Sequence, residues 1–268
     1  MTLHDLAGVA ERAARAGGAV LLDHRDKVLE VTLKDARVDV SSSADLAAQE
    51  AVVAAIRAER PDDLVLGEED APDTSEPVAG LCWWVDPLDG TRAFIDGFPW
   101  FATAVSATLD GDPVAAAVHD PLRDELYAAV GGGGATCNGV PLQVSPASRA
   151  AEVVVCVQAQ SADPAVIAEF ARLMRAMLTV SGGVRFPGAP ALVMAHLAAG
   201  HLGGYVERDM APWDVAGGRL LIEEAGGRVT DFAGQVRDGS VRHDIVASCG
   251  GAVHDELVAA TGMRFEEG

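Results

Sequence analysis

The sequence predicts a layered α/β or α+β sandwich, in which helices cover the faces of sheets. The first observation is that predicted strands and helices interleave along both halves of the 268-residue chain. The second is the composition, because 49% hydrophobic and 22% charged residues are typical of a globular protein with a large core. A boundary near residues 145–150 divides the chain into halves at 1–145 and 146–268.

The first half opens with two predicted helices. Apolar residues recur at helical spacing from Leu6 onward and predict an amphipathic helix over residues 3–24. A second helix is predicted over 43–60, with Ser43 as its N-cap and Pro61 ending it.

Two short strands follow these helices. The apolar runs 64–66 and 81–85 predict buried strands, separated by a loop at 71–80. The first strand ends at the acidic run Gly67-Glu68-Glu69-Asp70. The second is expected to end at Pro87, because proline has no N–H for the ladder and fixes its own φ.

The pattern then becomes that of a β-sheet. Segments rich in Ala, Val and Thr predict strands over 101–109, 114–118 and 125–130. Asn138-Gly139 favours a type I′ hairpin turn. The four glycines at 131–134 precede no Gly-Lys-Ser/Thr, so we interpret them as a strand connection and not as a nucleotide loop.

The second half alternates strands with helices. Strands are predicted at 153–157, 205–207 and 245–249, and helices at 164–178, 190–199, 212–225 and 252–261.

Charge and composition exclude several classes of protein. The formal net charge of −20 argues against sequence-independent nucleic-acid binding, which needs clustered Lys and Arg. No segment approaches the roughly 20 apolar residues of a membrane helix. The N-terminus carries acid where a signal peptide carries base, so a cytoplasmic location is expected.

Cysteines and histidines give no metal-binding pattern. The four cysteines form no CxxC pair, which favours reduced thiols over a zinc cage or a disulfide framework. The seven histidines show no HxH or HExxH spacing, and each is interpreted as a surface or packing residue.

Acidic residues cluster at strand ends and at one helix start. Asp86 and Asp89 follow the apolar run 81–85, and carboxylates in this position suit a hard cation such as Mg²⁺. The backbone N–H groups of Gly90-Thr91 could hold a phosphate. The segment therefore suggests metal-assisted phosphate chemistry. Taken alone, Glu68-Glu69 could be a solvated turn, and Asp214 could be a first-turn acid favoured by the helix dipole.

A covalent phosphatase mechanism is excluded by spacing. Haloacid-dehalogenase-type phosphatases also run an apolar strand into Asp-Gly-Thr, but their nucleophile and acid form an Asp-x-Asp pair. Asp86 and Asp89 are three residues apart, which would put the second carboxylate on the wrong side of the strand end.

Three motifs together resemble the signature of the inositol monophosphatase family, which comprises lithium-sensitive, Mg²⁺-dependent phosphatases. They are Gly67-Glu68-Glu69, the run from Asp86 to Thr91, and Trp213-Asp214 followed after eleven residues by Gly226-Gly227. The similarity covers about residues 5 to 262. It implies the αβαβα sandwich of the fructose-1,6-bisphosphatase/inositol monophosphatase fold and a homodimer.

The resemblance also implies roles for individual residues. Two or three Mg²⁺ ions would be bound by Glu68, Asp86, the carbonyl of Leu88, Asp89 and Asp214. Thr91 with Asp45 would polarise the attacking water, with Glu68 beside them near any third ion. The amides of Gly90 and Thr91 would bind the phosphate group.

The substrate-selecting segment departs from the family pattern. Glu207 matches the family's acid that binds substrate hydroxyls, although alone it would more often be a surface acid. Gly188 and Ala189 occupy the other predicted substrate positions, but Ala189 has no hydroxyl where the family usually has Ser or Thr. Pro190 also removes a backbone donor, which weakens the expectation of inositol phosphate without affecting the metal chemistry.

The sequence thus predicts a phosphomonoesterase acting on a small-molecule phosphate ester, with myo-inositol 1-phosphate as the leading candidate. Histidinol phosphate is an alternative, since phosphatases of that type also carry Arg and Phe at positions such as Arg92 and Phe94. A sugar or nucleotide phosphatase is another. A regulatory or binding protein on the same fold is the alternative that is not an enzyme.

Overall fold

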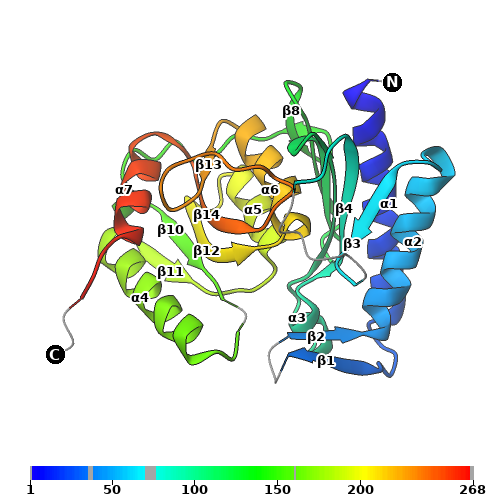
Figure 1. The fold of residues 1–268 in the computed structure, drawn as a ribbon, viewed down its shortest axis with the longest axis horizontal. Helices are drawn as coiled ribbons and strands as arrows, with labels where there is room; N and C mark the ends of the chain where they lie inside the picture. Colours follow the sequence, from blue (N-terminus) through cyan, green and yellow to red (C-terminus); the bar gives the residue numbers. More distant parts are fainter. Residues whose placement is uncertain (1, 36–38, 70–76, 160, 266–268) are drawn as a thin grey trace.

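Five layers make up the structure, which is a computed structural model describing residues 2–35, 39–69, 77–159 and 161–265. Two sheets alternate with three pairs of helices, so the predicted αβαβα sandwich is confirmed (Figure 1). In the described part of the chain, no helix is long and apolar enough to span a bilayer.

The outer and middle layers are helical. Helices α1 and α2 cover one face of the larger sheet, α5 and α6 lie between the sheets, and α4 and α7 cover the far face of the smaller sheet (Figure 1). The helices are α1 Leu3–His24, α2 Ser43–Glu59, α3 Thr91–Ile95, α4 Pro164–Val180, α5 Pro190–Ala198, α6 Pro212–Glu224 and α7 Gly251–Thr261, with a 3₁₀ turn η1 at Ala150–Glu152.

The larger sheet follows chain order, β3-β4-β5-β6-β7-β8-β9. Its pairs are antiparallel except that β3 runs parallel to β4. The strands are β3 Leu64–Gly67, β4 Leu81–Asp89, β5 Ala102–Leu109, β6 Asp112–Asp120, β7 Glu125–Val130, β8 Gly134–Cys137 and β9 Val140–Pro141.

The smaller sheet has the order β11-β10-β12-β14-β13. Strand β10 runs parallel to β11 and β12, while β14 is antiparallel to its neighbours. The strands are β10 Val154–Val157, β11 Gly183–Arg185, β12 Gly204–Met210, β13 Arg228–Thr230 and β14 His243–Ser248. The two large sheets thus come from opposite sides of residue 145, but a division into two independent halves stays a prediction.

Strand β4 lies in the middle of the sandwich. Trp83 packs with the α1–α2 side of the sheet, and Trp84 packs with Trp213 and Ala216 of α6 on the other side. Successive side chains of a strand point to opposite faces. Because helices cover both faces, residues 81–85 of the strand are all apolar and do not alternate with polar residues.

The prediction that β4 ends at Pro87 is wrong. The strand continues to Asp89, with Asp86 opposite Ala104 and Asp89 opposite Ala102, so β4 carries one residue more than β5. Pro87 sits in this β-bulge, which is where a residue without an N–H is tolerated inside a sheet. Its carbonyl accepts a hydrogen bond from Thr103 Oγ1 at 3.0 Å.

The start of α2 also differs from the prediction. The N-cap is Ser42 and not Ser43, because Ser42 Oγ accepts from Ala44 N at 3.2 Å and Ser42 N donates to Asp45 Oδ2 at 2.7 Å. Asp45 thereby closes a capping box. Just before it, the strands β1 Val31–Asp35 and β2 Asp39–Ser42 form a small antiparallel sheet that the sequence pattern did not indicate.

The other main expectations fit the structure. Asn138 and Gly139 both have positive φ between β8 and β9, as a type I′ turn requires. The glycines at 131–134 connect β7 to β8. Of the loop expected at 71–80, residues 77–80 show no helix or strand, and the rest lies outside the described residues, as does Asp70.

Candidate metal centre

The bulge of β4 presents two buried carboxylates. Asp86 Oδ1 accepts a hydrogen bond from Leu88 N at 3.0 Å, and Asp89 Oδ2 accepts one from Leu192 N at 2.8 Å. The other oxygen of Asp89, Oδ1, is buried and finds no hydrogen-bond partner among the described residues. A buried carboxylate oxygen without a donor is costly unless a cation binds it.

The donor Leu192 belongs to the first turn of α5, which begins at Pro190. The positive end of this helix therefore faces Asp89 across the sandwich. The sequence pattern does not indicate this contact directly. Its signal was Pro190 itself, since proline is favoured in the first turn of a helix and marks where the orphan N–H groups start.

Two further acids reach the same place from other elements. Glu68 follows β3, and the parallel register that pairs Gly67 with Val85 sets Glu68 beside Asp86. Asp214 lies in the first turn of α6, where its Oδ2 accepts from Ala211 N at 3.3 Å. The structure thus brings together Glu68, Asp86, Asp89 and Asp214 from two elements, β4 and α6, and from the end of a third, β3.

The acids of this group repel one another. Burial and then the charge of Glu68 raise the pKa of Asp86 and Asp214 well above the ordinary value. Burial likewise raises the pKa of Asp89 to about 8, against the hydrogen bond from Leu192. Such a set is stable as carboxylates only when a cation neutralises it. Oxygen ligands from several segments are what Mg²⁺ prefers, so these residues fit the predicted metal.

A threonine and an aspartate lie beside the acids. Thr91 Oγ1 is 2.8 Å from Asp45 Oδ1 and 3.0 Å from the Leu88 carbonyl oxygen. Asp45 Oδ2 accepts from Ser42 N and from Ser42 Oγ, at 2.7 and 2.6 Å. Burial raises the pKa of Asp45, although these hydrogen bonds oppose the rise. The capping box of α2 therefore also fixes the carboxylate that pairs with Thr91.

The turn after β4 touches the predicted substrate segment. Gly90 has a φ of +93°, and a Cβ there would lie 2.9 Å from the Trp100 carbonyl oxygen and 3.1 Å from Ala189 Cβ. Trp100 Nε1 in turn donates to the Gly188 carbonyl at 2.9 Å. Glycine is thus required at Gly90, and Gly188 and Ala189 are close to it. Ala189 has a φ of +52°, which is strained for alanine.

Glu207 is buried and not a surface acid. It lies on β12 with 5% of its surface exposed, and its charge acts on Asp89 and Asp214. It accepts hydrogen bonds from the Tyr205 hydroxyl and, at 3.5 Å, from Gln158 Nε2. Burial raises its pKa to about 7. The role of Tyr205 was not predicted, although its position two residues from Glu207, on the same face of the strand, was a usable signal.

Comparisons with known proteins agree with this arrangement. A profile of the inositol monophosphatase family, whose members are magnesium-dependent phosphatases, matches residues 2–263. The Nus factor SuhB of Pseudomonas aeruginosa is 34% identical over 237 residues, which are 87% of each chain. Among solved structures, SuhB of Bartonella henselae has a TM-score of 0.88 at 30% identity and covers 97% of this chain and 100% of its own.

A second solved structure bears the name of the family. The inositol monophosphatase of Anabaena is 30% identical, with a TM-score of 0.81, and the match covers 96% of this chain and 95% of the other. The family profile spans nearly the whole sequence, and the fold and the convergence of acids agree with it. The chain therefore belongs to the inositol monophosphatase family.

Proposed function

We propose that the protein is a Mg²⁺-dependent phosphomonoesterase that hydrolyses a small polyol or sugar phosphate. The observation that carries the proposal is the convergence of Asp86, Asp89, Asp214 and Glu68, where Asp89 Oδ1 has no hydrogen-bond partner among the described residues. Structural acids in a core are normally paired with cations of the protein. Here Arg242 lowers the pKa of Asp214, but burial and the charges of neighbouring acids leave that pKa well raised.

The metal ligands would divide into two overlapping sets. Glu68, Asp86 and the Leu88 carbonyl would hold one Mg²⁺, and Asp86, Asp89 and Asp214 a second, with Glu68 also near any third. Bound Mg²⁺ supplies a Lewis acid that activates water and neutralises charge on the phosphate. This use of Asp86 by two ions agrees with the charges of Glu68, Asp89 and Asp214, all of which act on its carboxyl group.

The protein's own groups would orient the reactants. Thr91 donates its hydroxyl proton to Asp45, which leaves lone pairs on Thr91 Oγ1 to accept a hydrogen bond from the attacking water. The amides of Gly90 and Thr91 would hold phosphate oxygens, because the positive φ of Gly90 opens the turn there. Attack in line with the leaving oxygen needs no covalent intermediate.

We place myo-inositol 1-phosphate first among substrates. The carboxylate of Glu207 would accept hydrogen bonds from substrate hydroxyls, and it is already oriented by Tyr205. The name of the Anabaena relative supports the same substrate. Histidinol phosphate and other sugar or nucleotide phosphates remain alternatives, because Ala189 and Pro190 change the neighbouring contacts. Inhibition by Li⁺, a cytoplasmic location and a homodimer are further predictions.

A regulatory role is the second candidate. Relatives at 31–34% identity, from Pseudomonas aeruginosa to Escherichia coli, bear the name Nus factor SuhB, which is not the name of a hydrolase. The present chain carries the complete set of predicted metal ligands, which favours catalysis over a purely regulatory role.

A substrate panel tests the proposal. Phosphate release should be measured with inositol 1-phosphate, histidinol phosphate, fructose 1,6-bisphosphate and 3′-phosphoadenosine 5′-phosphate, with Mg²⁺ and then with added Li⁺. We expect Mg²⁺-dependent release that is fastest with inositol 1-phosphate. Absence of turnover on every ester, despite bound Mg²⁺, would leave the regulatory role.

A further inference from the structure

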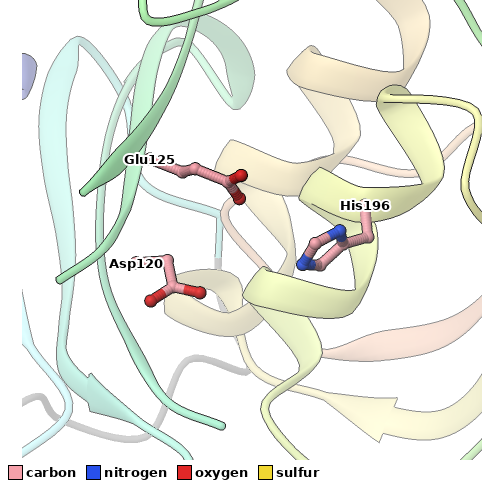
Figure 2. A group of neighbouring side chains, drawn as sticks. All are labelled: Asp120, Glu125 and His196. Carbon is pink, nitrogen blue, oxygen red and sulfur yellow. The ribbon is translucent and has the colours of Figure 1, made fainter. Parts of the chain in front are cut away.

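A second group of side chains that could bind a metal shares no residue with the acidic centre of Glu68, Asp86, Asp89 and Asp214. Asp120 ends β6, Glu125 begins β7 and His196 belongs to α5, and one ligand atom from each lies within 4.8 Å of the other two. Figure 2 shows the imidazole of His196 directed across the gap toward the two carboxylates. No side chain of this group is among the predicted Mg²⁺ ligands.

Among the described residues, only one nitrogen of the His196 imidazole has a hydrogen-bond partner. Its Nδ1 is 2.9 Å from His201 Nδ1, so one ring donates to the other. Its Nε2 is buried and has no hydrogen-bond partner within the described residues. When His196 Nδ1 carries the proton and donates to His201, Nε2 keeps a free lone pair. A histidine that ligates a metal usually donates its other N–H in this way.

Both carboxylates are oriented by neighbouring donors. Asp120 is fully buried, and its Oδ1 accepts from Leu122 N and Arg123 N at 3.0 and 3.1 Å. Glu125 Oε2 accepts from the Tyr127 hydroxyl at 2.6 Å. All three side chains thus have the outer contacts that orient the ligands of metal sites.

We propose that Asp120, Glu125 and His196 form a separate binding site for a divalent transition-metal ion such as Zn²⁺. Two carboxylates and one imidazole suit this class of ion better than Mg²⁺, which prefers oxygen alone. Tetrahedral ligands of zinc lie about 3.4 Å apart, so the group must contract by up to about 1.4 Å on binding. Glu125 and His196 are only partly buried, so we assign this movement to their side chains.

An arginine competes with the metal for this site. Arg123 Nη1 is 2.5 Å from Asp120 Oδ2, and the guanidinium lies 5.6 Å from the ring centre of Trp100. The side chain of Arg123 is 40% exposed, so it can turn into solvent when an ion arrives. The ion must therefore displace one positive charge, which lowers its affinity.

Equilibrium dialysis of Zn²⁺ against the full chain, in excess Mg²⁺, tests the proposal. We expect one Zn²⁺ per chain, with affinity at least about tenfold weaker in His196→Phe and in Glu125→Gln. His196 stacks on Trp100, with ring centres 5.1 Å apart, and phenylalanine can keep this packing. Glutamine can still accept from the Tyr127 hydroxyl, so both variants keep the contacts that support the fold. Asp89→Asn removes a carboxylate from the acidic centre, and this variant should still bind one Zn²⁺ per chain with the parent's affinity.

Arg123→Gln should change the affinity for Zn²⁺ in the opposite direction. Removing the competing charge should tighten zinc binding by roughly tenfold, whereas a merely structural network would show no such gain. The proposal is overturned if the parent binds no Zn²⁺, or if His196→Phe and Glu125→Gln keep the parent's affinity for it. It is also overturned if Asp89→Asn no longer binds one Zn²⁺ per chain, or if Arg123→Gln fails to tighten Zn²⁺ binding.

Discussion

Leu192 N donates a hydrogen bond to Asp89 Oδ2 at 2.8 Å, across a separation of 103 residues in sequence. This contact joins the first turn of α5 to the bulge of β4. It uses one oxygen of Asp89 and leaves Oδ1 buried without a hydrogen-bond partner among the described residues. The packing of α5 between the two sheets is therefore what prepares Asp89 as a ligand.

The metal-free protein should lose stability as the pH rises. Burial raises the pKa of Asp89 to about 8 and that of Glu207 to about 7, both above their values in the unfolded chain. The contribution of these two groups to the free energy of unfolding is fully present below about pH 4, where both carboxyl groups are neutral. It is lost as the pH rises through their pKa values in the folded protein. Thermal melts in a chelator should show Tm falling from about pH 5 to about pH 8, and Mg²⁺ should restore it most at the higher pH. A Tm that is independent of Mg²⁺ at the higher pH would contradict this prediction.

The hydroxyl of Thr91 should be required for turnover. Thr91→Val keeps the shape but removes the donor to Asp45, so we expect kcat to fall by about 10² to 10⁴. Thr91→Ser restores the hydroxyl and should recover most of the activity. Steady-state kinetics on the best substrate compare the two variants, and equal losses in both would exclude a role for the hydroxyl.

Glu207 should control substrate preference more than chemistry. Glu207→Gln keeps a side chain of the same size but removes the charge, and the Tyr205 hydroxyl can still donate to the amide oxygen. We expect kcat/KM to fall by about tenfold more for a polyol phosphate than for p-nitrophenyl phosphate, which offers no hydroxyl groups. The same loss on both substrates would remove Glu207 from substrate recognition.

A histidine outside both metal sites should set part of the acid sensitivity. His254 is buried between Ser248 Oγ and Thr230 Oγ1, each 2.9 Å from a ring nitrogen, and burial lowers its pKa to about 4. The folded state favours the neutral ring, so its stabilisation is present above about pH 6.5 and is lost as the pH falls toward 4. His254→Gln should lower Tm at neutral pH and reduce the further fall in Tm between about pH 7 and about pH 5. An unchanged pH dependence would assign that fall to other groups.

The part of the site that sequence predicts best is local. Asp86, Asp89, Gly90 and Thr91 stand within one short run, and their residue types indicate metal and phosphate chemistry before any contact is known. The layers could also be predicted, since apolar patterning marks the main helices and the central strands, although it does not mark β1 and β2. Bulges are harder to predict, because a proline such as Pro87 is compatible both with the end of a strand and with an extra residue inside one.

The parts that sequence did not predict depend on contacts between distant segments. The donors to Asp89 and Glu207 come from Leu192, Tyr205 and Gln158, and only packing of β4, α5 and the smaller sheet brings them together. His196 illustrates the same limit. It has no spacing typical of a metal ligand, yet the fold sets it beside Asp120 and Glu125.

Phosphate release from myo-inositol 1-phosphate by the parent and by Asp89→Asn, each titrated with Mg²⁺, tests the central claim most directly. Asparagine can still accept from Leu192 N, so the fold at α5 is retained while one metal-binding charge is lost. We predict Mg²⁺-dependent turnover in the parent and a loss of at least about 10³ in the variant at saturating Mg²⁺. Equal turnover in the two proteins would contradict the assignment of this acidic centre as the site of catalysis.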